Sequence, residues 1–445
     1  MIYTIADNKK YNYSTPLIEY IKEKHLYNGE NLIYTSKYTD GTFSITNPTL
    51  EYKNCEFVNG YPHFNIPLDV CLEEIDFFLK GGNMYDYQFN IRYGDTHPHK
   101  PVPKLAQVRN ITIENSLHSM IGNNVNSYYG VGDISIKSLT DFASKYGIDI
   151  PNDELFIKLV NNTLDDSIRG KLLDYDRDAI NKIRNFLNDI NFPIRNFLLE
   201  STLYYNQDLY QKLKNDELYK DNLKDNGELK YSLQELMFIY SIIKSDRDVL
   251  INIIGANQTD HVLKVSEILE KSDPNVNCKF LTYGICRNAD ERDYSKWQNY
   301  FEEFIMKNNI TINNRLITSD EFLKILITVL TNDNIMDFDN LDKYLKNIQT
   351  CCDGLSKRDY YYDNNIIHGK SDLICKMALV GYTLNRSIEM CNQNNFYKYL
   401  LSVMNEYESN KEKYYDMRKL YYEFIRVGFS RLGFKEDVKR RVLVK

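Results

Sequence analysis

Strand-like and helix-like segments alternate between Ile91 and about Gly255, and this alternation limits the fold more than any other feature of the sequence. The clearest segments are the helix Val108–Ile121, the strand Val125–Val131, the helix Ile136–Lys145, the helix Leu233–Ser245 and the strand Asp248–Gly255. Alternation at this spacing predicts a parallel sheet with helices on both faces. We therefore expect an α/β fold in which residues 91–310 form a Rossmann-like domain.

The flanking parts of the chain have different patterns. Residues 1–90 predict a small α+β domain with the strands Asn31–Ser36, Thr42–Ile45 and Cys55–Val58 and the helix Asp69–Leu79. After Asn257 nearly everything is expected to be helical, because apolar residues recur at helical spacing in Glu321–Leu330, Asp372–Met390, Asn395–Glu408 and Tyr414–Leu432. Residues 311–445 are thus predicted to form an all-α bundle, with Gly433 as the C-cap of its last helix.

Composition excludes several classes of protein. The eight cysteines are scattered apart from the pair Cys351–Cys352 and form no CxxC motif, which favours reduced thiols over a disulfide framework or a zinc site. The longest apolar runs are far shorter than the roughly 18 residues that a membrane span needs. The first residues also lack the basic-then-apolar order of a secretory signal. We expect a cytoplasmic protein without a membrane partner.

The charge of the chain is unevenly distributed. The whole chain has a net charge of −7, whereas residues 398–445 contain twelve lysines and arginines and seven acids, a net charge of +5. A basic end on an acidic body predicts a localised anion-binding surface. The alternative is an ordinary solvated helix face. Tyrosines of this region, such as Tyr414, Tyr415, Tyr421 and Tyr422, are expected to divide about equally between base stacking and core packing.

Two loops of the α/β part follow strands and precede helices. They are residues 95–101 and 255–261, and in a doubly wound sheet such loops bind ligands at helix N-termini. His97 and His99 could form a metal pair, but the sequence offers no third ligand, so we expect no metal site. No Walker A loop, GxGxxG, GxSxG or HExxH motif is present.

Several short motifs occur in the order found in one known family. They are the run from Glu56 to Ile66, Lys100-Pro101, Val108-Arg109-Asn110-Ile111, Val131-Gly132-Asp133-Ile134, Glu200-Ser201 with Tyr204, Gly255-Ala256-Asn257, Phe338-Asp339, and the C-terminal set Arg418, Leu420, Gly428, Leu432 and Gly433. In this order they resemble arginyl-tRNA synthetase, a class I aminoacyl-tRNA synthetase, over most of the chain. The resemblance implies a catalytic domain followed by an anticodon-binding-type helical bundle.

The resemblance also implies that both catalytic signatures have changed. Where the family has His-x-Gly-His, whose histidines donate to the ATP phosphates, this chain has Lys104-Leu105-Ala106-Gln107. Lys104 and Gln107 are the residues that could replace the lost donors, and Lys100 is the lysine that some members carry before this motif. The second signature, Lys-Met-Ser-Lys-Ser, is reduced to Ser295 and Lys296.

Binding residues are carried over in the same way. The resemblance places His97, Lys137, Tyr231 and Glu235 in the arginine pocket, where Glu235 replaces the aspartate that binds the guanidinium. It places Gly255, Ala256, Asn257 and Ser295 at the nucleotide, and Arg418, Arg426, Arg440 and Arg441 at the tRNA. Pocket residues that change in length and charge favour a different amino-acid specificity.

These changes lead to one expected function with two alternatives. We expect a protein that binds tRNA, and also arginine and ATP, but in which ATP-dependent arginine–tRNA ligation is weakened or lost. The alternatives are an active arginine–tRNA ligase with divergent motifs, and a repurposed enzyme that uses arginine or arginyl-tRNA to form an amide or peptide bond. ATP with Mg²⁺ is the substrate complex if the protein is active, and otherwise no cofactor is expected. The partner is tRNA, with a partner protein left open and DNA not expected.

Overall fold

The computed structural model describes residues 2–4, 13–25, 31–35, 42–46, 52–192, 194, 196–225, 227–284, 286–287, 294–330, 336–357 and 371–434. Its central sheet has the strand order β1-β10-β9-β6-β7-β8. These strands are β1 (Ile2–Thr4), β6 (Gln88–Thr96), β7 (Val125–Val131), β8 (Asn196–Leu199), β9 (Asp248–Gly255) and β10 (Cys278–Tyr283). Five of them are parallel, and β1 joins β10 in the antiparallel direction. The expected α/β class is confirmed.

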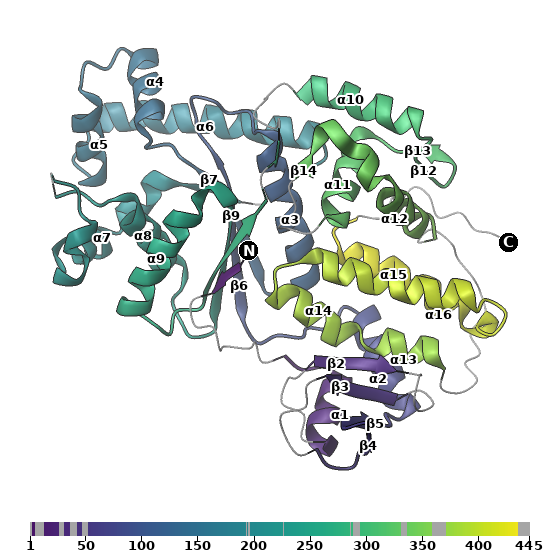
Figure 1. Ribbon diagram of the computed structural model, residues 1–445. Coiled ribbons are helices and arrows are strands. Elements are labelled where there is room, and N and C mark those ends of the chain that lie inside the picture. The colour runs from purple at the N-terminus through teal and green to yellow at the C-terminus, as the bar shows by residue number, and fades with distance from the viewer. Residues whose placement is uncertain are drawn as a thin grey trace.

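Alternating side chains of the central strands supply two hydrophobic cores. On β9, Val249, Ile251 and Ile253 pack into the core that contains α3 (Leu105–Ile121), whereas Leu250 packs into the core on the opposite face. Successive side chains of a strand point to opposite faces, so each face can be covered by its own helices. The second face carries α4 (Ile136–Tyr146), α5 (Asn152–Val160), α6 (Asp166–Asp189), α7 (Gln207–Asn215), α8 (Tyr231–Ile242) and α9 (Thr259–Ser272), seen with α3 in Figure 1.

The N-terminal part is a second, antiparallel sheet with the order β2-β3-β5-β4. It consists of β2 (Asn31–Thr35), β3 (Thr42–Thr46), β4 (Glu56–Val58) and β5 (Tyr61–Phe64), with the helices α1 (Pro16–His25) and α2 (Leu68–Leu79). Aromatic rings join this part to the C-terminal helices, since the ring of Phe78 on α2 lies 5.2 Å from that of Phe424. Figure 1 shows the small sheet below the C-terminal helices.

The C-terminal part is mainly helical. Its helices are α10 (Tyr294–Lys307), α11 (Ser319–Val329), α12 (Leu345–Lys357), α13 (Asp372–Ala378), α14 (Val380–Glu389), α15 (Gln393–Ser409) and α16 (Arg418–Arg431), with the short strands β11 (Cys286–Arg287), β12 (Thr311–Ile312), β13 (Arg315–Leu316) and β14 (Met336–Asp337). Short 3-10 helices occur at residues 200–205, 217–222, 256–258, 338–344 and 415–417. No helix among the described residues is long and apolar enough to cross a membrane.

Three expectations about elements were wrong. The C-cap of α16 is Leu432 and not Gly433, which follows it in the left-handed region with a φ of 87°. The strand β10 lies in a region expected to be helical, and all six of its residues are buried. The run Cys278–Tyr283 contains Lys279 and Thr282 and is buried on both faces, so it has no alternation of apolar and polar residues that would separate it from a helix. The helix expected over Asp372–Met390 is two helices that meet at Leu379. The Tyr399 hydroxyl on α15 lies 2.8 Å from the carbonyl oxygens of Lys376 and Met377 and stabilises the end of α13.

Candidate functional site

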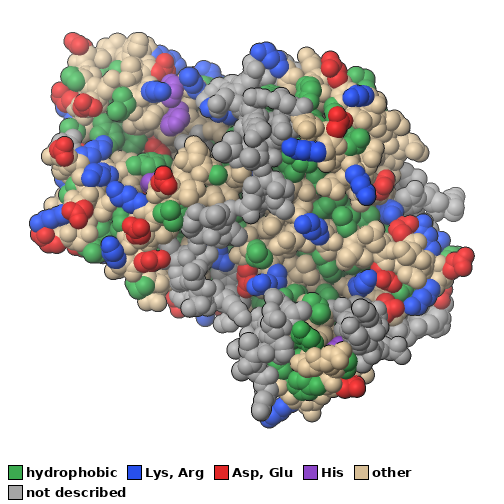
Figure 2. Space-filling view, in the orientation of Figure 1, with side chains coloured by type: hydrophobic (Ala, Val, Ile, Leu, Met, Phe, Trp, Pro, Cys, Tyr) green, Lys and Arg blue, Asp and Glu red, His purple; other side chains and the backbone are tan. Residues whose placement is uncertain are grey.

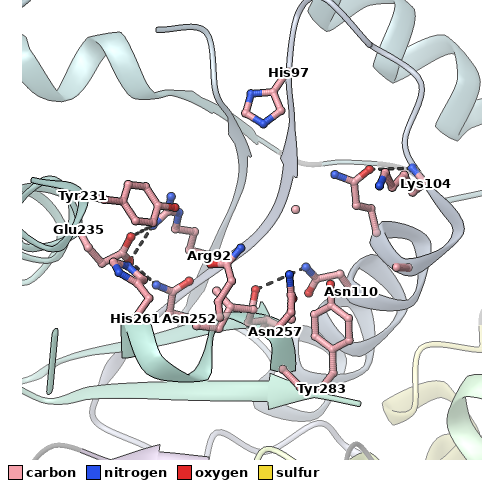
Figure 3. Close-up of a pocket in the computed structure, with 18 of the residues that line it drawn as sticks. Arg92, His97, Lys104, Asn110, Tyr231, Glu235, Asn252, Asn257, His261 and Tyr283 are labelled. Carbon is pink, nitrogen blue, oxygen red and sulfur yellow. Dashed lines mark hydrogen bonds and ion pairs between the residues drawn. The ribbon is translucent and has the colours of Figure 1, made fainter. Parts of the chain in front are cut away.

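A cavity of about 990 Å³ lies at the carboxyl ends of β6, β9 and β10. Strand β7, which follows β6 in the chain, pairs with one edge of β6, and β9 pairs with the other edge. Parallel α/β sheets bind ligands at such a reversal of strand order. The walls come from the loops after β6 and β9 and from the first residues of α3, α4 and α8 (Figure 3).

Most side chains expected to act lie together on the walls of this cavity. They are His97, Lys100, Lys104, Gln107, Lys137, Tyr231, Glu235, Gly255, Ala256 and Asn257. The structure therefore collects residues that are up to 160 positions apart in the sequence, while their individual roles stay predictions. Lys296 is exposed on α10 and is not among the residues that line the cavity. The side chain of Ser295 lies outside the described residues.

One end of the cavity is the N-terminus of α3. Lys104 is the N-cap of this helix, and the Gln107 side chain accepts the Lys104 backbone N–H through Oε1 at 2.7 Å. Gln107 thus stabilises the first turn of the helix with the oxygen of its amide. The remaining N–H groups and the dipole of α3 give this end a partial positive charge, to which Lys100 and Lys104 add full charges.

Hydrogen bonds orient two histidines that line the cavity. The Nδ1–H of His97 donates to the carbonyl oxygen of Gly132 at 3.0 Å, and His99 Nδ1 lies 3.1 Å from the Ser138 hydroxyl. Their ring centroids are 5.4 Å apart. Within the described part of the chain, no group of three or more His, Cys, Asp or Glu side chains is arranged to hold a metal ion.

Arg92 is a residue of this site that the sequence analysis missed. It lies on β6, and its Nη1 donates to both carboxylate oxygens of Glu235 at 2.7 Å. The guanidinium packs 4.4 Å from the ring centre of Phe238. Burial alone would lower the pKa of Arg92, but Glu235, Tyr231 and Glu200 together outweigh burial and raise this pKa. The signal was an arginine within the strand-like run Phe89–Tyr93, because a charge in a buried strand requires a partner.

The same end of the cavity holds an aromatic pair and buried acceptors. The rings of Tyr231 and His261 lie 4.4 Å apart, and burial lowers the pKa of His261. The Asn252 amide donates to Glu235, whereas its Oδ1 and that of Asn110 are buried without a hydrogen-bond partner among the described residues. Buried acceptors without partners indicate a place for the donors of a ligand.

Comparison with known proteins identifies the fold of the chain. No family model matches the chain, and no curated protein sequence matches it. Among solved structures, the arginyl-tRNA synthetase of Plasmodium falciparum has a TM-score of 0.63 at 12% sequence identity, covering 94% of this chain and 97% of that chain. The arginyl-tRNA synthetase of Thermus thermophilus has a TM-score of 0.56 at 11% identity, covering 86% and 87%. The chain has an arginyl-tRNA synthetase-like fold.

The helices expected to contact tRNA are present in this arginyl-tRNA synthetase-like fold. Arg418 begins α16 and stacks 4.7 Å from the ring centre of Tyr415, which is 61% exposed. Arg426 also lies on α16 and is 3.8 Å from the carboxylate of Glu423. Arg440 and Arg441 lie outside the described residues. The structure thus places two of the four predicted tRNA-binding residues on one helix.

Of the four tyrosines considered for base stacking, two belong to the core. Tyr414 and Tyr421 are fully buried, and Tyr421 stacks on Tyr407 at 3.9 Å. Tyr415 is exposed and Tyr422 is half-buried. The expected equal division between packing and exposure agrees with these positions.

Proposed function

We propose that this protein binds tRNA and ATP as an arginyl-tRNA synthetase-like protein in which arginine–tRNA ligation is weakened or lost. The observation that carries the proposal is the likeness of the whole fold, together with a basic cavity at the strand ends where α/β sheets bind their ligands. No comparison favours another function.

The nucleotide is proposed to extend along the mouth of the cavity. Lys100, Lys104 and the N-terminus of α3 would hold its phosphates, because cations and backbone N–H groups favour negative charge. The nucleoside would contact the loop that begins at Gly255. A Cβ at Gly255 would lie 2.5 Å from Asn257 Oδ1, so a larger residue there would require the Asn257 side chain to move. Mg²⁺ would be held mainly by the phosphates and water, as is usual for this ion.

Adenylation is proposed to be slow because groups that would stabilise the reacting phosphates are missing. The segment Lys104–Gln107 contains no histidine, and the Gln107 oxygen is engaged with the Lys104 N–H. Lys296 also stands apart from the cavity lining. Each lost donor costs roughly 3 kcal/mol of transition-state stabilisation, so two losses slow the step by several orders of magnitude.

The test combines nucleotide binding with ATP–pyrophosphate exchange, measured with arginine in the presence and absence of arginine-acceptor tRNA. We expect an ATP analogue to bind, and we expect exchange to be at least about 1000-fold slower than the turnover of about 10 per second that is typical of enzymes. Lys104→Ala should weaken the binding of the analogue, whereas Lys158→Ala on the distant helix α5 should not.

Two results would contradict the proposal. Exchange at about 1–10 per second would show that ligation is intact. A wild-type protein that binds neither the analogue nor tRNA would show that the fold has been retained without either proposed ligand.

A further inference from the structure

The carboxylate of Glu235 is already neutralised by an arginine of the same chain. Both oxygens of Glu235 accept from Nη1 of Arg92, and the amide of Asn252 donates to one of them. The side chains of Arg92 and Glu235 are 13% and 5% exposed, so water does not screen this pair strongly. Figure 3 shows the three side chains together at the end of the cavity opposite Lys104.

The rest of the cavity has an excess of positive charge. Glu235 is the only acid among the described residues that line it, whereas Arg92, Lys100, Lys104 and Lys137 contribute four cations. Lys137 has no ion pair or hydrogen bond with the described part of the chain. A cationic ligand that bound to Glu235 would therefore have to displace Arg92. The guanidinium of Arg92 would then be buried without its partner, which is unfavourable.

An anionic ligand could bind Arg92 without breaking its contact with Glu235. The hydrogen bonds that Arg92 makes to described residues all use Nη1, and the residue lines the cavity, so further N–H groups of its guanidinium are left to bind a ligand. A guanidinium whose charge is fixed beside a cavity binds carboxylates through paired N–H donors.

We propose that Arg92 makes this end of the cavity selective for a small carboxylate-bearing anion, such as an acidic amino acid, and that free arginine does not bind there. The proposal rests on the proposed function, because it names the small molecule that binds beside the nucleotide. Arg92 is the residue that determines the charge of the ligand, and Lys137 adds to the favourable field.

The experiment measures the binding of L-arginine, L-aspartate and L-glutamate by calorimetry, with and without an ATP analogue. Wild type is expected to bind at least one of the two acids and to bind L-arginine at least 100-fold more weakly. Arg92→Ala exposes Glu235 to the ligand, so we expect it to bind L-arginine or methylguanidinium and to lose the acid. Lys158→Ala, which removes a cation outside the cavity, should leave both affinities within twofold of wild type.

A second variant keeps the test decisive if Arg92→Ala does not fold. The double change Arg92→Gln with Glu235→Gln removes both charges and keeps polar side chains of similar size. This variant should bind neither L-arginine nor the acid tightly. Stronger binding of L-arginine than of the acids by wild type would overturn the proposal, as would an unchanged preference in either variant. Binding of the ATP analogue is scored separately, so its absence would refute the proposed function without deciding the charge preference.

Discussion

Arg92 and Glu235 are 143 positions apart in the sequence, and in the structure Nη1 of Arg92 donates to both carboxylate oxygens of Glu235. The substitution of aspartate by glutamate at position 235 was expected to lengthen a side chain that binds an external guanidinium. The structure instead gives this carboxylate an internal partner. At the residue scale, the proposed charge preference of the cavity therefore depends on both residues together, and the sequence around either one does not indicate their contact.

Glu74 is a second buried carboxyl, away from the cavity. It lies on α2 at 0% exposure, and its Oε2 accepts the backbone N–H of Leu17 at 2.9 Å. Burial raises the pKa of Glu74 to about 7, from an ordinary value of 4.5. The unfolded chain therefore releases this proton before the folded chain does. The contribution of Glu74 to stability is fully present below about pH 4.5 and is lost as the pH rises through 7.

Glu74→Gln should remove this pH dependence. The variant is expected to match wild type near pH 4.5 and to be more stable by up to about 3 kcal/mol at pH 8, since each unit of pKa shift corresponds to about 1.4 kcal/mol. Urea unfolding at half-unit pH intervals measures the difference. The control is Glu73→Gln, an exposed residue of the same helix, which should follow the wild-type curve. Parallel curves for wild type and Glu74→Gln would contradict the prediction.

At the scale of elements, glycine sets how closely the C-terminal helices approach. Gly428 lies on α16, and a Cβ there would be 2.5 Å from Cδ2 of Leu400 on α15. Leu400 is fully buried, so its side chain has no free space into which to move. Gly170 lies on α6 with nothing within 4 Å of the corresponding position. Glycine at position 428 thus allows α15 and α16 to approach closely, whereas glycine at position 170 only lowers the stability of α6.

Replacement by alanine should therefore have opposite effects at these two positions. Gly428→Ala is expected to destabilise the protein by about 1–3 kcal/mol through overpacking. Gly170→Ala is expected to stabilise it by roughly 0.5–1 kcal/mol, because alanine is the better helix former at an exposed position. Urea denaturation of both variants checks the pair. An equal effect of the two substitutions would show that the contact with Leu400 does not limit the helix spacing.

At the scale of the whole molecule, the positive charge of the C-terminal helices is partly compensated. Lys411 lies 2.6 Å from Glu408, Lys413 lies 3.2 Å from Asp372, and the half-buried Arg431 donates to the carbonyl oxygen of Ser119 at the end of α3. On the face shown in Figure 2, lysines and arginines are interspersed with acids. We therefore expect the proposed RNA affinity to depend strongly on residues 439–441, which carry three consecutive cations.

We predict that arginine-acceptor tRNA binds more weakly to the double variant Arg440→Ala with Arg441→Ala. Each lost phosphate contact should lower the slope of log affinity against log salt by about 0.7–0.9. A salt titration with labelled tRNA measures both quantities. The matched control replaces Lys145 and Lys158 by alanine, on α4 and α5, which Figure 1 shows far from α15 and α16. An unchanged slope, or no binding by wild type at low salt, would contradict the prediction.

The sequence by itself determined the α/β class and the position of the cavity. Periodicity is a local property, so the strands Val125–Val131 and Asp248–Gly255 could be predicted from their own residues. Ligands of a parallel α/β sheet bind outside the carboxyl ends of its strands, which is why the loops at residues 95–101 and 255–261 were expected to bind a ligand. The order of the family motifs added the resemblance that the fold comparison supports.

Only the tertiary structure decided where buried charges and buried strands find their partners. β10 became a strand because β9 and β1 bond to its two sides, and its own short sequence is equally compatible with a helix. α13 ends at Ala378 beside a tyrosine hydroxyl from α15. Arg92 is charged in a buried strand because Glu235 reaches it from α8. Each of these outcomes depends on contacts between residues far apart in the chain, which no local pattern encodes.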